Sequence, residues 1–487
     1  MSVYNRKISS PVLRSFLRCE IKILSINSTI MARFNFLSIC MAASQSSATF
    51  WRDLLILLHR YAGIFIAPFI FVAAFTGLLY VLTPQLEQWT YHDVLVSQAK
   101  SQPKSLTEQI QVAQSVMSPT AQIISVRPAA TSHDTTRVIY SDPQQQIANH
   151  AIFIDPHDLK VKGQLEVYGT SGILPLRTFL DRLHRDLRLG EWGRVYSELA
   201  ASWMGILALS GIYHWFKRRK QLKQFSEHKK NYLIKWHSWL GLALLPLLLF
   251  FSITGLTWSN WAGSNILSMR QWLGWQTPSL ITSLATNSIS KPDIHQEHHA
   301  GMIMHMHSMV NAKDFSDALQ LARDNGIGAA KVQIRPPATM NQAWIVEEID
   351  RAWPTQVDSI SVDILNHKVI DHVYFDQFPL AAKLTRWGVD AHMGILFGWP
   401  NQLLLILFAV GLCITIVLAY RAWWQSTDFK KTTLDFSRRA VVMWCHGRFI
   451  QRLGLILILT LVGIILPIFG ISILLALTIV ILGYKKA

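Results

Sequence analysis

Charged residues are scarce in this 487-residue sequence: they make up 16% of it, whereas hydrophobic residues make up 51%. Soluble globular chains carry about 25% charged residues, so the low share argues against a soluble protein. The formal net charge of +16 by itself suggests a nucleic-acid partner. However, the lysines and arginines stand beside apolar runs, where they are typical of membrane topology. We therefore expect a lipid bilayer as partner and no nucleic acid.

Cysteine is also scarce, and familiar cofactor signatures are missing. None of the four cysteines falls in a segment expected outside the membrane, so no disulfide framework is predicted. The CxxCH attachment site of c-type haem is absent, and so is a strand-GxGxxG-helix unit for NAD or flavin. Residues 1–50 are basic but lack the compact apolar core of a signal peptide. We expect them to form a disordered cytoplasmic extension.

Long apolar runs are abundant. Because about 20 apolar residues cross a hydrocarbon core, the sequence predicts four transmembrane helices, over 51–83, 194–216, 233–258 and 394–421. A further run, 453–484, is interrupted by Pro467 and Gly470 and has basic residues at both ends. This pattern favours a C-terminal hairpin of two spans over one long helix.

Basic residues concentrate in the segments 217–232 and 422–452. The positive-inside rule assigns both segments to the cytoplasm as loops. The segments 84–193 and 259–393 then lie outside the membrane. These assignments predict a multi-pass protein of a bacterial inner membrane with a cytoplasmic N-terminus.

The first and third spans align without a gap. Leu58–Tyr80 reads LHRYAGIFIAPFIFVAAFTGLLY, and Trp236–Trp258 reads WHSWLGLALLPLLLFFSITGLTW. The matched positions are His59 with His237, Gly63 with Gly241, Pro68 with Pro246, and Thr76-Gly77 with Thr254-Gly255. Shared apolar character does not explain these matches, so we infer a duplication in which each half holds a span, an external domain and a return span.

The external segments repeat more weakly. Each begins with an amphipathic helix, at 105–117 and 314–324. Strand-like runs then follow at 121–127, 136–141 and 150–155 in the first segment and at 330–335, 342–348 and 358–364 in the second. The predicted fold is a mainly α membrane protein: a duplicated bundle of four core transmembrane helices plus a C-terminal hairpin, with two external α+β domains.

Histidines stand at corresponding ends of the repeated spans. His59 and His237 lie at the same depth near the cytoplasmic boundary. Two neutral imidazoles from facing helices are a suitable axial pair for a haem. Gly63 and Gly241 lie one turn deeper on the same helix faces, where they leave room for a porphyrin.

Two further histidines, His184 and His392, occupy the external boundary, each before a glycine. By the same reasoning they predict a second haem near the outer face. His214, near the cytoplasmic end of the second span, remains an alternative ligand in place of His59 or His237. A single histidine at a membrane boundary often only faces lipid headgroups; four in two repeat-related pairs favour ligation.

Five segments resemble the PepSY-associated transmembrane-helix family, over residues 52–425. They are LH…G…TGLLY, LHRDLRLG, GIYHWFKRRK, WHSWLGL…TGL and DAHMGILFG. That family includes iron-regulated inner-membrane proteins and ferric-siderophore reductases with two b-type haems. The resemblance implies PepSY-like external domains, two haem b groups and oxidoreductase activity toward a ferric siderophore or other periplasmic Fe(III) chelate. The electron donor is then a separate cytoplasmic protein or a quinol.

A stretch of alternating histidine and methionine lies in the second external segment. Imidazole and thioether together suit copper, and imidazole alone suits zinc, nickel or iron. The spacing is irregular, so a solvated loop stays equally open. The candidate ligands are His295, His298, His299, His305 and His307.

Two other functions remain open from the sequence. The external domains are compatible with a non-enzymatic membrane anchor that binds peptides or regulates proteases. A siderophore or metal transporter is the other alternative, although the spans carry few charged residues near the midplane, where transport sites usually lie.

Overall fold

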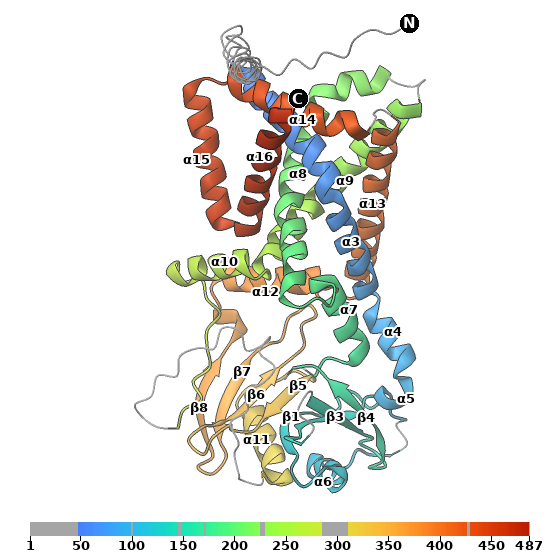
Figure 1. Cartoon of the computed structure of the whole chain (residues 1–487). Helices are drawn as coiled ribbons and strands as arrows, with labels where there is room; N and C mark the ends of the chain where they lie inside the picture. Colours follow the sequence, from blue (N-terminus) through green and yellow to red (C-terminus); the bar gives the residue numbers. More distant parts are fainter. Residues whose placement is uncertain are drawn as a thin grey trace, which may run out of the picture.

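The computed structural model describes residues 47–98, 101–144, 149–169, 172–224, 229–284, 310–425 and 429–486. Most of the predicted N-terminal extension and all five histidines of the His/Met stretch lie outside the described residues. A bundle of long helices stands on a β-sheet domain, with three shorter helices, α7, α10 and α12, between them (Figure 1). We call the two ends of the bundle the sheet-side end and the far end.

Four helices are long and apolar enough to cross a membrane, and they overlap the four predicted spans. The first runs from α2 (Ser47–Leu57) through a π-helical turn, η1 (Leu58–Ala62), into α3 (Gly63–Val81). The others are α8 (Glu191–Gln224), α9 (Lys229–Thr257) and α13 (Trp399–Trp424). The chain is therefore a membrane protein with several apolar helices.

The far end holds more helix than expected. The predicted loop at 217–232 is largely helical, because α8 and α9 continue through its lysines, arginines and glutamines, which favour helix. The segment 422–452, also expected as a loop, contains α14 (Phe429–His446), which lies across the far end (Figure 1). Met443 of α14 packs into a cluster with Phe50 and Tyr61, and this burial stabilises the helix.

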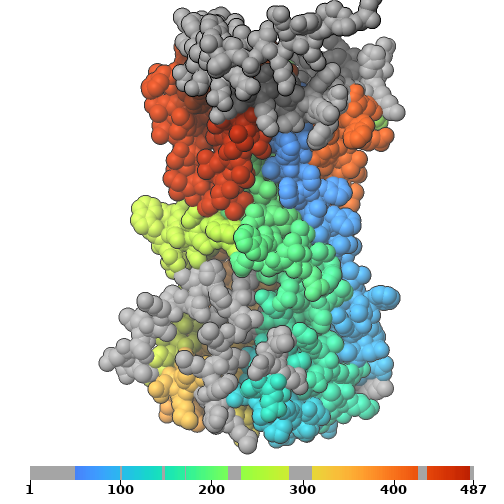
Figure 2. Space-filling model, in the orientation of Figure 1, coloured from blue at the N-terminus to red at the C-terminus, as the bar shows by residue number. Residues whose placement is uncertain are grey.

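The C-terminal hairpin consists of α15 (Phe449–Ile465) and α16 (Pro467–Lys486), which lie beside the bundle (Figure 1). Gly463 and Gly470 let the two helices approach closely, since a Cβ added at either would lie 3.0–3.2 Å from the other glycine's Cα. Trp203 of α8 donates a hydrogen bond to Ser472 of α16 at 2.9 Å. Figure 2 shows the hairpin, in red, as a surface layer of the molecule.

The strands of the two external segments form one continuous antiparallel sheet. Its strand order is β4-β3-β2-β1-β5-β6-β7-β8, so two four-stranded meanders meet at the β1–β5 pair, where Val126 lies opposite Ile334. An unpaired strand edge exposes backbone groups, and this pairing removes one edge from each meander. The strands are β1 (Gln122–Arg127), β2 (Thr136–Ser141), β3 (Asn149–Ile154), β4 (Val161–Val167), β5 (Val332–Arg335), β6 (Trp344–Glu348), β7 (Ser359–Asp363) and β8 (Lys368–Val373).

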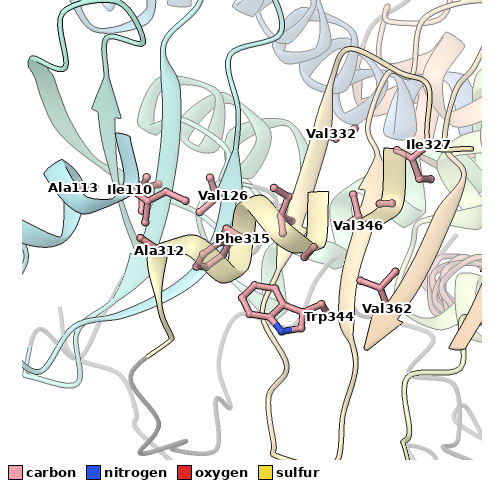
Figure 3. Packing of buried hydrophobic residues seen from close by; sticks show 14 of the residues in the cluster. Ile110, Ala113, Val126, Ala312, Phe315, Ile327, Val332, Trp344, Val346 and Val362 are labelled. Carbon is pink, nitrogen blue, oxygen red and sulfur yellow. The ribbon is translucent and has the colours of Figure 1, made fainter. Parts of the chain in front are cut away.

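Two amphipathic helices, α6 (Leu106–Val116) and α11 (Ala312–Asp324), cover one face of the sheet and pack on each other. Phe315 of α11 lies fully buried against Trp344 of β6, with ring centroids 4.9 Å apart (Figure 3). The core is shared by the two meanders, because Val126 of β1 and Ile110 of α6 belong to the same cluster as Phe315 and Trp344. The sheet domain is thus one packing unit.

The opposite side of the domain leads into the bundle. After β4 the chain forms α7 (Pro175–Asp186) and continues into α8; after β8 it forms η2 (Phe375–Gln377) and α12 (Leu380–His392) and continues into α13. The remaining short helices are α4 (Thr83–Thr90), α5 (His92–Leu95) and α10 (Trp261–Trp272). The element order of the first half therefore recurs in the second and places α7 and α12 at the sheet-side end.

Candidate functional site

The sheet-side end holds one pair of histidines, His184 at the end of α7 and His392 at the end of α12. Each hydrogen-bonds through Nδ1 to a threonine of a membrane-spanning helix. The Nδ1–Oγ1 distance is 3.1 Å from His184 to Thr76 and 2.7 Å from His392 to Thr254. These threonines are the repeated Thr-Gly positions of the first and third spans, so the repeat extends to the contacts of the histidines.

The threonine hydroxyls determine which ring nitrogen carries the proton. Thr76 donates its hydroxyl hydrogen to the carbonyl of Val72 at 2.7 Å, and Thr254 donates to Phe250 at 2.8 Å. A hydroxyl has one hydrogen, so each threonine oxygen accepts the Nδ1–H of its histidine. Both neutral imidazoles therefore keep a lone pair on Nε2, the nitrogen that faces away from the threonine.

Burial keeps this sheet-side pair neutral. It lowers the pKa of His392 to about 3, and the nearby His184 contributes to the shift. Burial also lowers the pKa of His184. Neutral imidazole is the form that coordinates a metal, so both side chains are in a ligating state at neutral pH.

At the far end, His59 and His237 have the same arrangement with other partners. His59 Nδ1 lies 3.1 Å from the carbonyl oxygen of Leu207, and His237 Nδ1 lies 3.0 Å from that of Thr415. A carbonyl oxygen only accepts, so each Nδ1 carries the hydrogen and each Nε2 again carries a lone pair. The two ring centroids are 6.2 Å apart.

Two backbone features position His59. It lies within the π-helical turn η1, a distortion that occurs frequently at functional sites. Gly211 of α8 faces its ring, and a Cβ there would lie 3.1 Å from Cε1 of His59. Glycine therefore permits the close approach of α8 to this imidazole.

His214, the alternative ligand, is close to the far-end pair but differs in orientation. Its ring centroid lies 5.2 Å from that of His59. Its Nε2, not its Nδ1, faces a backbone carbonyl, that of Leu55 at 3.4 Å. The structure thus brings together all five predicted histidines in two groups, and four of them share one anchoring pattern.

The spacing of the far-end pair fits a haem that His59 and His237 would hold between them. A metal–imidazole bond is about 2 Å long, so two imidazoles on one metal would have ring centroids about 6 Å apart, and those of His59 and His237 are 6.2 Å apart. All four histidines are half-buried. A Cβ at Gly241 would meet nothing within 4 Å, and one at Gly63 only Leu207 at 4.0 Å. Among the described residues, no cluster of three or more His, Cys, Asp or Glu has the arrangement of a bare metal site.

A large cavity of about 2920 Å³ reaches residues close in sequence to the sheet-side pair. Its wall includes residues of the sheet, α7, α10 and α12, among them Val389 and Met393 on either side of His392. Arg177, Arg185 and Arg194 line this cavity. Two neighbouring arginines, Arg182 and Arg188, instead lie over the rings of Tyr168 and Phe179 at 4.9 and 4.7 Å.

Sequence reasoning missed the residues that hold the histidines. Thr76 and Thr254 could be recognised as matched positions of the repeat. Because His184 and His392 also correspond to each other, this match was the signal that could have paired each threonine with a histidine. Thr415 and Leu207 act through backbone carbonyls, which leave no residue-type signature.

Comparison with known proteins gives one family. The description "PepSY-associated TM region" matches residues 56–426, which include the four spans apart from most of α2, the sheet domain and all four anchored histidines. The C-terminal hairpin lies beyond the match. No curated protein matches the chain.

Proposed function

The chain belongs to the family of the PepSY-associated TM region, and we propose that it is a haem-b oxidoreductase that reduces an Fe(III) chelate. The proposal comprises a duplicated bundle with PepSY-like domains on the outer side of a bacterial inner membrane and a cytoplasmic N-terminus. Two haem b groups are proposed, one held by His59 and His237 and one by His184 and His392. A ferric siderophore is the expected chelate, with a role in iron acquisition.

The observation that carries this proposal is the shared tautomer. Each of the four histidines engages Nδ1 with a threonine hydroxyl or a backbone carbonyl. Histidines that ligate metals usually donate their other ring N–H in this way, which fixes the ring and raises its basicity.

The chain's own residues contribute position and exclusion of water. Bound haem would supply a one-electron iron couple at each end of the bundle. His59 and Thr76 are 17 residues apart on one continuous helical segment, about 26 Å at 1.5 Å per residue. Because Thr76 contacts His184, the two proposed haem positions lie toward opposite faces of a membrane. The donor, a separate cytoplasmic protein or a quinol, is proposed to act at the far end, and the chelate at the cavity of the sheet-side end.

The test is an absorption spectrum of the purified protein from haem-replete cells, before and after reduction with dithionite. We expect a reducible b-type spectrum with two haems per chain. Replacing His59 and His237 with alanine should remove about half of the absorbance, and His214→Ala is the matched control that should keep it. A colourless wild-type protein refutes the proposal.

Activity is measured separately. Proteoliposomes with a reductant on the far-end side should release Fe(II) from an added ferric chelate, followed with a chromogenic Fe(II) chelator. The double variant at the far end should lose this activity, because one of the two haem positions is missing. Equal rates in wild type and variant would contradict the assignment.

A further inference from the structure

A second, smaller pocket opens off the large cavity, between the first meander and α4 and α7. Its volume is about 450 Å³. Its ionisable wall residues are four cations and one carboxylate: Arg127, Arg137, Arg177, Lys331 and Glu87. We call it the arginine pocket.

The one carboxylate is already engaged. Glu87 Oε2 accepts a hydrogen bond from Nη2 of Arg177 at 2.7 Å. Arg127 of β1 instead donates to the side-chain oxygen of Gln333 at 2.8 Å, and Arg137 of β2 donates to the carbonyl of Gly172 at 3.1 Å. Among the described residues, both strand arginines therefore donate these hydrogen bonds to neutral groups.

The two strand arginines also repel each other. Burial lowers the pKa of Arg127 to about 9; the neighbouring Arg137 adds to the shift, and Glu347 opposes it. Burial likewise lowers the pKa of Arg137, to about 10, with Glu87 opposing and Arg177 reinforcing it. Buried cations without a bound anion are costly, so a ligand of negative charge would stabilise this arrangement.

We propose that the arginine pocket binds the carboxylate groups of an anionic, carboxylate-rich Fe(III) chelate, which identifies the substrate class of the proposed reductase. A guanidinium presents its N–H groups in a planar fork that matches a carboxylate with two hydrogen bonds. Ligand pockets have volumes of about 300–1,000 Å³, so 450 Å³ suits a small hydroxycarboxylate chelate. This step rests on the proposed function.

The location connects the pocket with the sheet-side histidines. Arg127, Arg177 and Lys331 line both the arginine pocket and the large cavity. Arg177 precedes His184 by seven residues on α7, which is two turns along the same helix face, or about 10 Å. A chelate held by the arginine pocket therefore lies close to the histidine pair that is proposed to hold the outer haem.

The experiment measures binding without electron transfer. Gallium(III) citrate, a redox-inert analogue of ferric citrate, is titrated calorimetrically into the full-length protein in nanodiscs. Replacing Arg127 and Arg137 with glutamine should weaken binding at least about tenfold, since each removes a charge-assisted hydrogen bond. The control replaces the exposed Lys160 and Lys313, which line neither pocket, with glutamine; it makes the same change of charge and should bind as wild type does.

A second double variant guards against misfolding. Replacing both arginines with lysine keeps the charge and should retain part of the affinity for gallium citrate. The affinity of the wild type should also fall as the salt concentration is raised. Gallium(III) bound to a trihydroxamate forms a neutral complex without carboxylates, and it should bind no more weakly to the glutamine variant than to wild type.

Several results would overturn the assignment. If the wild type does not bind gallium citrate, or if the glutamine variant binds it as tightly as the wild type does, the arginine pocket is refuted. It is also refuted if binding of the gallium trihydroxamate depends on the two arginines to the same extent. The absorption spectrum tests the proposed function independently. If the protein holds both haems but does not bind gallium citrate, only the proposed substrate class is refuted. If the protein is colourless but shows arginine-dependent binding, only the proposed reductase function is refuted.

Discussion

Thr254→Val is the sharpest test of how His392 is held at the sheet-side end. Valine has nearly the shape of threonine but no hydroxyl, so the substitution removes the acceptor that lies 2.7 Å from Nδ1 of His392. The Nδ1–H is then buried without a partner, which costs about 1–3 kcal/mol. Loss of such a supporting contact typically weakens metal affinity about 10–100-fold, equivalent to about 1.4–2.7 kcal/mol.

The assay is the rate of haem transfer from the purified protein to excess apomyoglobin. We expect a biphasic transfer in Thr254→Val, with one haem leaving about 10–100 times faster and the other at the wild-type rate. Thr254→Ser keeps the hydroxyl and should resemble wild type.

Thr257→Val is the matched control for this assay. Thr257 donates only to the carbonyl of Thr254, at 2.7 Å, and its removal leaves the bond to His392 in place. If Thr254→Val held both haems as tightly as wild type, the threonine would not position His392 and the reasoning from tautomers would fail.

Three other predictions concern separate parts of the molecule. Gly211→Ala places a Cβ 3.1 Å from the ring of His59 and should reduce haem content at the far end alone, as read from the reduced spectrum. Phe315→Ala should destabilise the sheet domain by about 3–5 kcal/mol, measured as a lower urea midpoint for proteolysis of that domain. Ser105 hydrogen-bonds to Glu108 and lowers its pKa below the usual 4.5, so this stabilisation is present above about pH 4.5 and lost as the pH falls through the folded-state pKa. In Ser105→Ala, the stability of the sheet domain should therefore depend less on pH below about 4.5, measured with the same proteolysis assay at a series of pH values.

Local patterns predicted the elements that carry a strong period. The run 136–141 coincides with β2, and the amphipathic helices predicted at 105–117 and 314–324 correspond to α6 and α11. The edge strands β4 and β8 escaped prediction because they are mostly half-exposed or exposed and lack an apolar face that alternates clearly. The pairing of β1 with β5 was not predicted either, because Val126 and Ile334 are far apart in the sequence and such a pairing has no local sequence pattern.

The site was predictable to the same depth. The four histidines could be named because a duplication and a family resemblance both indicated them, and the family is confirmed. The ligation itself stays a prediction. The close approach of Gly211 to His59 depends on how α8 packs against η1, and no spacing within a single helix reveals it. The arginine pocket likewise combines strands, α4 and α7 from distant parts of the chain.

The seam between β1 and β5 has a mechanical consequence. Because the eight strands form one hydrogen-bonded ladder over a common core, the helix pairs that lead from the two meanders are tied together at the sheet-side end. Carriers that alternate their access rock one half of the bundle against the other, and here such rocking would have to shear the ladder or bend it at its centre. Electron transfer requires no such movement. A disulfide engineered across the seam should therefore leave chelate reduction intact while it would arrest a rocking carrier.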